Sequence, residues 1–446
     1  MRAMSWILFT MRGGRRGLYL EPMDPAQTRA APPQSKHSPA PQPDSREAFW
    51  RLLATLALMT IGASAMYVVP VILPAVQVDF GIARAQASTP YSLLMIGYGV
   101  GGFLMGRLAD RRGLPLPIVI GAVALCAGYL IAANARDITT FTVAHAVLMG
   151  LIGSSVTFSP LLADTSLWWV KRRGMAVAVC ASGNYLGGAI WPPVVQHFVD
   201  AAGWRATYVG LGIVCGTAML LLSLAMRRRP PQLEPAHDAA RTPADASRPF
   251  GFSPMTAQLL LCVAGIACCV AMSMPQVHIV AYCVDLGYGP ARGSQMLALM
   301  LGFGIVSRLA SGWICDRIGG LRTLLLGSAL QGVALLLFLP FQGMVSLYAI
   351  SILFGLFQGG IVPSYAIIVR EHFPPREMGA RVGAVIMCTL VGMALGGWMS
   401  GWIFDATGSY RAAFVNGLAW NAVNLAIALV LLRGAATPNR LVRAAS

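Results

Sequence analysis

The chain has 446 residues, of which 56% are apolar and only 11% are Asp, Glu, Lys or Arg. Soluble proteins carry about 25% charged residues, so this composition excludes a soluble fold and indicates a protein of the lipid bilayer. The net charge of +16 is also typical of nucleic-acid-binding proteins, and the placement of the cations decides between these classes.

Twelve apolar stretches are long enough to cross about 30 Å of hydrocarbon. They lie at about 52–76, 86–106, 115–134, 140–163, 174–198, 205–226, 255–281, 293–313, 321–341, 344–369, 380–403 and 411–432. Backbone polar groups must be paired within lipid, and these stretches lack the alternation of barrel strands. The sequence therefore predicts an all-α membrane protein with twelve transmembrane helices.

A sequence motif occurs twice, at the same place in each half of the chain. Residues 106–113 read GRLADRRG, and residues 312–319, which begin 206 positions later, read GWICDRIG. Two further correspondences have nearly the same offset, residues 173–178 with 378–383 and residues 200–203 with 405–408. Repeats at one period indicate a duplication, so we expect two pseudo-symmetric six-helix bundles.

The polar segments divide the chain into five parts. We expect a disordered tail at 1–50, a first bundle at 51–226, a linker at 227–252, a second bundle at 253–433 and a second tail at 434–446. The linker is the only long polar interval between apolar stretches, which is typical of a flexible connection. Met23 is an alternative start, which leaves open whether residues 1–22 belong to the protein.

The cations are distributed unequally between the two sides of the predicted membrane. With the N-terminus in the cytoplasm, the cytoplasmic loops hold sixteen Lys and Arg residues. The opposite loops hold five, Arg84, Arg136, Arg205, Arg292 and Arg411. An excess of cations on the cytoplasmic side sets orientation. We therefore expect cytoplasmic termini, a bacterial-type inner membrane and no nucleic-acid partner.

No motif of an enzyme, a cofactor site or a metal site is present. The nine cysteines lack metal-ligand spacing, and the chain has no Walker loop and no HExxH sequence. Without a nucleotide-binding loop, transport would have to be driven by gradients. The sequence thus predicts neither an enzyme nor a cofactor.

The paired turns at 106–113 and 312–319 resemble those of the major facilitator superfamily, each between the second and third span of its half. Further segments resemble its monocarboxylate transporter branch, which includes oxalate–formate-type exchangers: residues 158–160, 169–174, 203–208, 275–278, 285–287 and Arg308. Eukaryotic members tend to carry an acid four residues before that arginine, where this chain has Gly304. Oxalate-type exchangers are expected to carry a lysine in span eleven, which 382–403 lacks.

Arg308 is the only cation more than two residues from the end of a predicted span, and a cation at a helix centre costs about 2.5–3.5 kcal/mol on insertion scales. Arg308 either snorkels or pairs with a carbonyl, or it binds a substrate carboxylate through two parallel hydrogen bonds. The resemblance favours the second interpretation. The other candidates for substrate binding are polar residues inside spans: Gln276, His278, Tyr282, Asn184, Tyr67, His145, Gln358 and Tyr365. For each of these, structural interhelical hydrogen bonding is the alternative.

The repeated turns are candidates for conformational gating. By resemblance, each aspartate faces the positive N-terminal end of span eleven or five across the seam between the halves. The residues concerned are Gly106, Asp110, Arg111, Gly113, Gly312, Asp316 and Arg317.

These observations predict a monomeric secondary active transporter that carries a small organic anion, such as a monocarboxylate, across the cytoplasmic membrane by alternating access. Co-transport of a proton (symport) stays open, because no acidic residue lies deep inside a predicted span. Two alternatives remain. One is an efflux carrier for a neutral or apolar compound, and the other is a non-transporting membrane sensor on the same fold.

Overall fold

The computed structural model describes residues 42–228, 249–374 and 377–444, with side chains up to residue 435. Most of the predicted N-terminal tail and of the predicted linker lie outside these residues. The first seven α-helices are α1 (Arg46–Gly62), α2 (Ser64–Phe80), α3 (Arg84–Arg112), α4 (Pro115–Ala133), α5 (Ile138–Val143), α6 (Ser159–Trp168) and α7 (Arg173–Ala225). The next seven are α8 (Pro254–Asp285), α9 (Pro290–Ile318), α10 (Gly320–Leu337), α11 (Met344–Gln358), α12 (Ile361–His372), α13 (Met378–Thr407) and α14 (Tyr410–Ala444). Within the described part of the chain there is no strand.

The number of membrane crossings agrees with the sequence. Eleven helical stretches of the described chain are long and apolar enough to cross a membrane. One of them, α7, has 53 residues, a length of about 80 Å against about 30 Å of hydrocarbon. Gly203 in its middle has φ 80° and ψ 162°, which is not helical. Helix α7 therefore contains two crossings. Together with the other ten stretches it gives twelve, which confirms the predicted number of transmembrane helices.

Three crossings are interrupted within the membrane-length stretch. The first divides into α1 and α2 at Ala63, and the fourth joins α5 to α6 through a π-helical segment, Ala144–Ser154. The tenth divides into α11 and α12 at Gly359 and Gly360. Irregular backbone at membrane depth is tolerated where it is buried in protein or lines a cavity, so these breaks direct attention to the interior.

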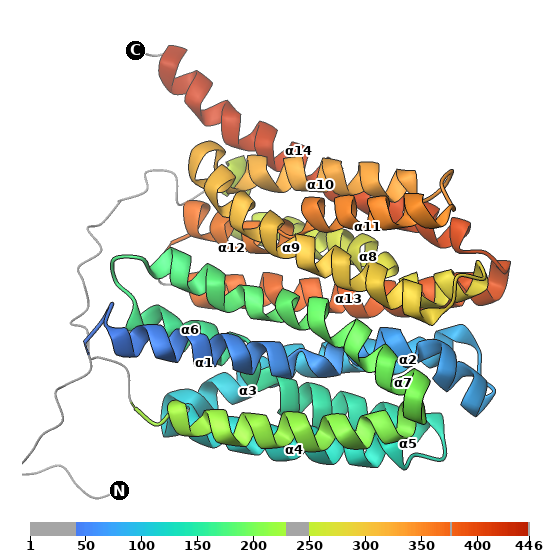
Figure 1. The fold of residues 1–446 in the computed structure, drawn as a ribbon. Helices are drawn as coiled ribbons and strands as arrows, with labels where there is room; N and C mark the ends of the chain where they lie inside the picture. Colours follow the sequence, from blue (N-terminus) through green and yellow to red (C-terminus); the bar gives the residue numbers. More distant parts are fainter. Residues whose placement is uncertain (1–41, 229–248, 375–376, 445–446) are drawn as a thin grey trace, which may run out of the picture. The chain divides into compact units, whose positions relative to one another are not determined.

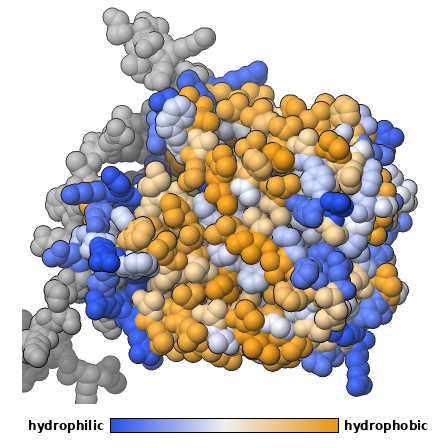
Figure 2. All heavy atoms as spheres, in the orientation of Figure 1, coloured by the Kyte–Doolittle hydropathy of each residue, from blue (hydrophilic) through white to orange (hydrophobic). Residues whose placement is uncertain are grey.

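The outward surface of the helices is apolar. Large side chains such as Val214 (61% exposed) and Leu221 (64%) are exposed and do not line the interior cavity described below. The long helices run alongside one another in Figure 1. Figure 2 shows apolar side chains across the middle of the visible face and hydrophilic side chains toward its two ends. This is the surface of a protein embedded in lipid.

The predicted halves contact each other through α3 with α13 and through α7 with α9. Glycines allow some of these helices to approach closely. A Cβ at Gly401 of α13 would lie 3.0 Å from the backbone of Ala85 in α3, and one at Gly392 would lie 2.5 Å from the carbonyl oxygen of Ile266 in α8. Small residues at such contacts are typical of membrane helices.

Two predicted boundaries differ from the structure. Helix α1 begins at Arg46, inside the predicted tail, because the Ser45 hydroxyl accepts a hydrogen bond from the Ala48 N–H and caps the helix. Helix α14 continues to Ala444, beyond the predicted end of the bundle at 433. The division into two bundles and a linker stays a prediction.

Candidate functional site

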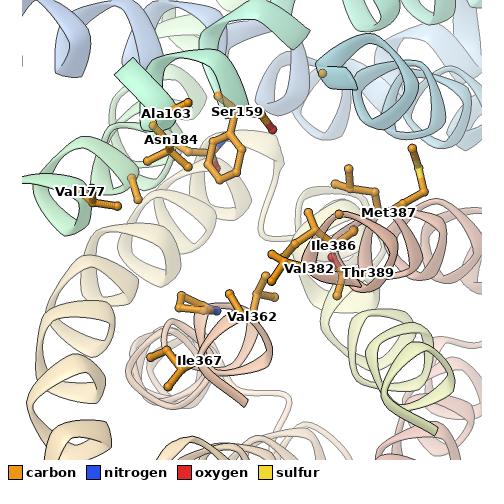
Figure 3. A pocket seen from close by; sticks show the side chains of 18 of the residues that line it. Ser159, Ala163, Val177, Asn184, Val362, Ile367, Val382, Ile386, Met387 and Thr389 are labelled. Carbon is orange, nitrogen blue, oxygen red and sulfur yellow. Dashed lines mark hydrogen bonds between the residues drawn. The ribbon is translucent and has the colours of Figure 1, made fainter. Parts of the chain in front are cut away.

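A cavity of about 3010 Å³ lies between helices of the two predicted halves. Figure 3 shows labelled side chains from several helices around this space. They are Ser159 and Ala163 of α6, Val177 and Asn184 of α7, Val362 and Ile367 of α12, and Val382, Ile386, Met387 and Thr389 of α13. Both predicted halves therefore line the cavity.

The cavity extends to one end of the helices only. Its lining includes Asp110 and Asp316 in the two repeated turns and Gly174 and Gly379 at the starts of α7 and α13. We call this end, where both repeated turns lie, the motif end. No residue from the opposite end of α3, around Arg84, lines the cavity.

The repeated turns do not hold the halves together in this conformation. Among the described residues, the carboxylates of Asp110 and Asp316 form neither an ion pair nor a hydrogen bond. The Arg317 guanidinium lies 3.5 Å from the ring centroid of Trp313, its neighbour one turn earlier, and Arg111 likewise has no ion pair there. The contacts expected across the seam are therefore absent while the motif end is open.

The glycines of the repeated turns have different structural roles. Gly113 and Gly319 end α3 and α9 with φ of 82° and 83°, a conformation that is essentially restricted to glycine. A Cβ added at Gly106 or Gly312 would meet nothing within 4 Å. Sterics thus require the last glycine of each turn in this conformation and not the first.

We call the opposite end the closed end. There, Arg84 of α3 joins the first half to the second. Arg84 is 7% exposed and forms a two-nitrogen ion pair with Asp285 of α8. Its guanidinium also donates to the Tyr410 hydroxyl of α14 and to Oε1 of Gln77 in α2, both at 3.0 Å. It lies 4.2 Å from the ring centroid of Phe404. One arginine of the first half is thus bound by three helices of the second.

Asp405 strengthens the same junction from α13. Its carboxylate accepts hydrogen bonds from the backbone N–H groups of Arg84 (2.9 Å) and Ala85 (2.8 Å). These N–H groups belong to the first turn of α3, where a carboxylate is favoured by the helix dipole. The aspartate that sequence analysis placed in an internal repeat therefore caps a helix of the other half.

Arg308 lies in the cavity lining, between α9 and α7. Its Nη1 donates to the carbonyl oxygen of Ala181 in α7 at 2.9 Å, and its Nε donates to the carbonyl oxygen of Gly359 at 3.4 Å. Its guanidinium carbon lies 4.3 Å from the ring centroid of Tyr185. The charge is thus held by carbonyl dipoles and a ring face rather than by a carboxylate.

Three other predicted binding residues line the cavity. Tyr67 donates to Oδ1 of Asn184 at 2.9 Å, which joins α2 to α7. Gln276 of α8 donates to Oε1 of Gln358 at 2.9 Å. Gln358 is fully buried, and it is not among the lining residues.

The two predicted histidines lie away from the cavity. His145 is fully buried against Phe141 and Tyr208, with its ring nitrogens at 2.8 Å from the Phe141 carbonyl oxygen and 3.0 Å from the Tyr208 hydroxyl. His278 is also fully buried, at 2.9 Å from the Tyr410 hydroxyl and 2.7 Å from the Gly397 carbonyl oxygen. Both make the interhelical hydrogen bonds that were the structural alternative.

Tyr282 and Tyr365 also lie outside the lining. Tyr282 packs edge-on against Tyr410 and Phe414 of α14. Tyr365 donates to Oδ1 of Asn424 at 2.9 Å. The Tyr282 ring and the Tyr365 hydroxyl thus make contacts within the second half, and the Tyr282 hydroxyl has no hydrogen-bond partner among the described residues.

The carboxylates that line the cavity lie near the motif end. Asp164 forms a bidentate ion pair with Arg51, at 2.8 and 2.9 Å, in which both side chains are less than a tenth exposed. Glu371 accepts from the Gly320 N–H at 3.2 Å and caps α10. In the described ranges no three His, Cys, Asp or Glu side chains come together as a metal site.

Sequence analysis missed two buried arginines and one aromatic residue. Arg51 and Arg84 fell just outside the predicted spans, whereas both lie inside helices and are buried. Arg308 is therefore not the only cation inside a crossing. The predicted outer loops hold five aspartates, as many as their cations, and two of them, Asp285 and Asp405, were the available signal for a partner of Arg84. Tyr185 carried no signal, because nothing along the sequence shows that it faces Arg308.

Comparison with known proteins gives the family. The profile of the Major Facilitator Superfamily matches residues 53–345 and 309–445. Monocarboxylate transporter 13 of Rattus norvegicus is 28% identical over 335 residues, which are 74% of this chain and 75% of the relative. Monocarboxylate transporter 12 of Mus musculus is 23% identical over 401 residues, 82% of each chain.

Solved structures of transporters share the fold. A bacterial homologue of the human lysosomal transporter Spinster, inward-facing and unoccupied, has a TM-score of 0.63 at 15% identity, over 88% of this chain and 96% of that one. The peptide transporter POT in complex with sulfate has a TM-score of 0.69 at 15% identity, over 90% and 98%. These relatives are membrane transporters and not enzymes. The chain therefore belongs to the Major Facilitator Superfamily, as a multi-pass membrane transporter related to the monocarboxylate transporters.

Proposed function

We propose that the protein is a secondary active transporter that carries a small organic anion by alternating access, with Arg308 as the substrate anchor. The observation that carries this proposal is the environment of Arg308. The residue lines a cavity shared by both halves, and carbonyl oxygens and an aromatic ring hold it in place of a carboxylate. A substrate carboxylate would supply the missing counter-charge.

The acidic residues of the cavity support an anionic substrate. Asp164 is already neutralised by Arg51, and Glu371 caps a helix. Asp110 and Asp316 lie in the turns at the motif end. A cationic substrate would require an unpaired carboxylate beside the central cavity, and the lining offers none there among the described residues. The names of the relatives, monocarboxylate transporters 12 and 13, agree with a carboxylate substrate.

The two ends of the helices support alternating access. The cavity reaches the motif end, and the cluster around Arg84 joins the halves at the closed end. With the motif end in the cytoplasm, as the cation distribution predicts, this conformation faces inward. We therefore assign the cluster around Arg84 as the outer closure and the repeated turns as the inner one.

The test measures carboxylate binding and uptake by Arg308 variants. Arg308→Ala and Arg308→Lys should both reach the membrane, and both should lose carboxylate uptake and carboxylate-induced thermal stabilisation. Lysine should not rescue, because its ammonium cannot form two parallel hydrogen bonds. Full carboxylate uptake by Arg308→Ala would refute the organic-anion function and would favour the alternative, a carrier of neutral compounds. If the protein is such a carrier, both variants should still transport the neutral compound.

A further inference from the structure

We propose that Tyr185 is the positioning residue that holds Arg308 for its substrate, and that Gly304 is required because it leaves room for the Tyr185 ring. This inference rests on the proposed function, since the group that is positioned is the anion-binding guanidinium. It adds a specificity-determining residue from the opposite half of the protein.

The first observation is that one turn of α7 contacts the guanidinium twice. Ala181 supplies the carbonyl oxygen that accepts from Nη1 of Arg308 at 2.9 Å. Tyr185, four residues later, lies on the same helical face and places its ring centroid 4.3 Å from the guanidinium carbon. A cation over a ring face is attracted most strongly when water is excluded, and Tyr185 is only 6% exposed.

The second observation is a notch in α9. Gly304 lies one turn before Arg308, on the same face. A Cβ at position 304 would lie 2.6 Å from Cε1 and 2.7 Å from Cδ1 of Tyr185, which is too close for any side chain. The ring therefore occupies the space that a side chain at 304 would fill. Gly302, two residues earlier, has no such constraint, because its Cβ would meet Ala189 Cβ at 3.7 Å.

The two halves of the protein supply different parts of the proposed anion-binding site. Helix α9 supplies the charge, while α7 supplies the ring and the carbonyl that fix its direction. A long arginine side chain has about 2 kcal/mol of rotamer entropy, so holding it in place before the anion arrives favours binding. The proposal assigns this role to the face of the Tyr185 ring, which contacts the guanidinium.

The experiment measures binding of benzoate and propionate to the purified full-length protein, with uncharged benzamide as the control ligand. Tyr185→Leu should weaken carboxylate affinity roughly tenfold, and Tyr185→Phe should stay within about twofold of wild type. Benzamide binding should not depend on either change. Carboxylate affinity within twofold of wild type in Tyr185→Leu would overturn the proposal.

The glycine supplies a matched pair of variants. Gly304→Ala should weaken carboxylate affinity as Tyr185→Leu does, because the new methyl displaces the ring, while Gly302→Ala should bind like wild type. Within Tyr185→Leu, the additional change Gly304→Ala should have little further effect. Equal losses in Gly302→Ala and Gly304→Ala, or full additivity of the two changes, would contradict the role of the notch.

A ligand-free measurement separates this inference from the proposed function. Thermal unfolding of Tyr185→Leu, Arg308→Met and the double variant forms a double-mutant cycle. The contact predicts non-additive losses, with a coupling of roughly tenfold in the unfolding equilibrium, and additive losses would refute it. If wild type binds neither carboxylate, the organic-anion function fails while the cycle still decides whether Tyr185 holds Arg308.

Discussion

Arg84→Ala should open the closed end of the protein. The substitution removes the side-chain bonds to Asp285, Tyr410 and Gln77, and it leaves the bonds between Asp405 and the backbone N–H groups in place. Breaking a buried ion pair costs about 3–5 kcal/mol. Because Asp285 is 30% exposed to screening water, about 2 kcal/mol is a better figure here. The bonds to Asp285 and Tyr410 join the halves, so most of this loss destabilises the closed arrangement, and the ratio of open to closed molecules should rise about 30-fold.

The assay is thiol labelling of a residue that the closed end buries. Ser92 of α3 is 7% exposed and donates to the carbonyl oxygen of Ala394 in α13, across the two halves. In purified protein whose nine native cysteines are replaced, Ser92→Cys should react slowly with a soluble thiol reagent. Arg84→Ala should raise that rate about 30-fold, in line with the shift in population.

A matched control is available at the same end. Arg205 pairs with Asp79 at 2.8 Å, with both side chains about 40% exposed and both residues in the first half. Exposed pairs contribute little, about 0–1 kcal/mol, and this pair does not join the halves. Arg205→Ala should therefore leave labelling at position 92 unchanged. An unchanged rate in Arg84→Ala would refute the assignment of Arg84 as the closure.

Three further outcomes are expected. Asp110→Asn should impair net transport while ligand affinity changes less than tenfold, about 1.4 kcal/mol. Transport by this variant at the wild-type rate would show that the turn only sets the orientation of the helices in the membrane. Gly113→Ala should lower thermal stability by about 1–3 kcal/mol because of its positive φ, whereas Gly106→Ala should be tolerated, and equal stability of the two would contradict the backbone argument. In intact cells, a cysteine at the exposed position Thr139 should react with an impermeant reagent and one at the exposed position Lys171 should not; the reverse pattern would invert the orientation.

The sequence predicts the fold well because membrane helices are encoded by apolar length alone. It also identifies the two turns, since Gly113 and Gly319 end helices in a conformation that other residues avoid. The predicted loop around Gly203 is shortened in the structure to one non-helical residue between two crossings, a detail that hydropathy does not resolve.

The candidate site is only partly predictable, because periodicity identifies residues on the same helical face but not the neighbour that the face meets. His278 and Tyr282 do share a face of α8, as their spacing predicts, and that face packs on Tyr410 of α14 rather than on the cavity. Conversely, Tyr185 of α7 contacts Arg308 of α9, although the two residues lie more than 100 positions apart in the sequence. A single sequence holds no record of such a pairing.

Under the proposed alternating access, the distribution of contacts would give the two states of the protein similar free energies. In this conformation Arg84 and Asp405 join the halves at the closed end, while Asp110 and Asp316 at the motif end have no hydrogen-bond or ion-pair partner among the described residues. Opening the closed end would lose the first set of contacts, and closing the motif end would let the two aspartates cap helix N-termini, each worth about 0.3–2 kcal/mol. Since the losses and gains are of similar size, a modest ligand contribution at Arg308, which contacts both halves, is enough to shift the balance.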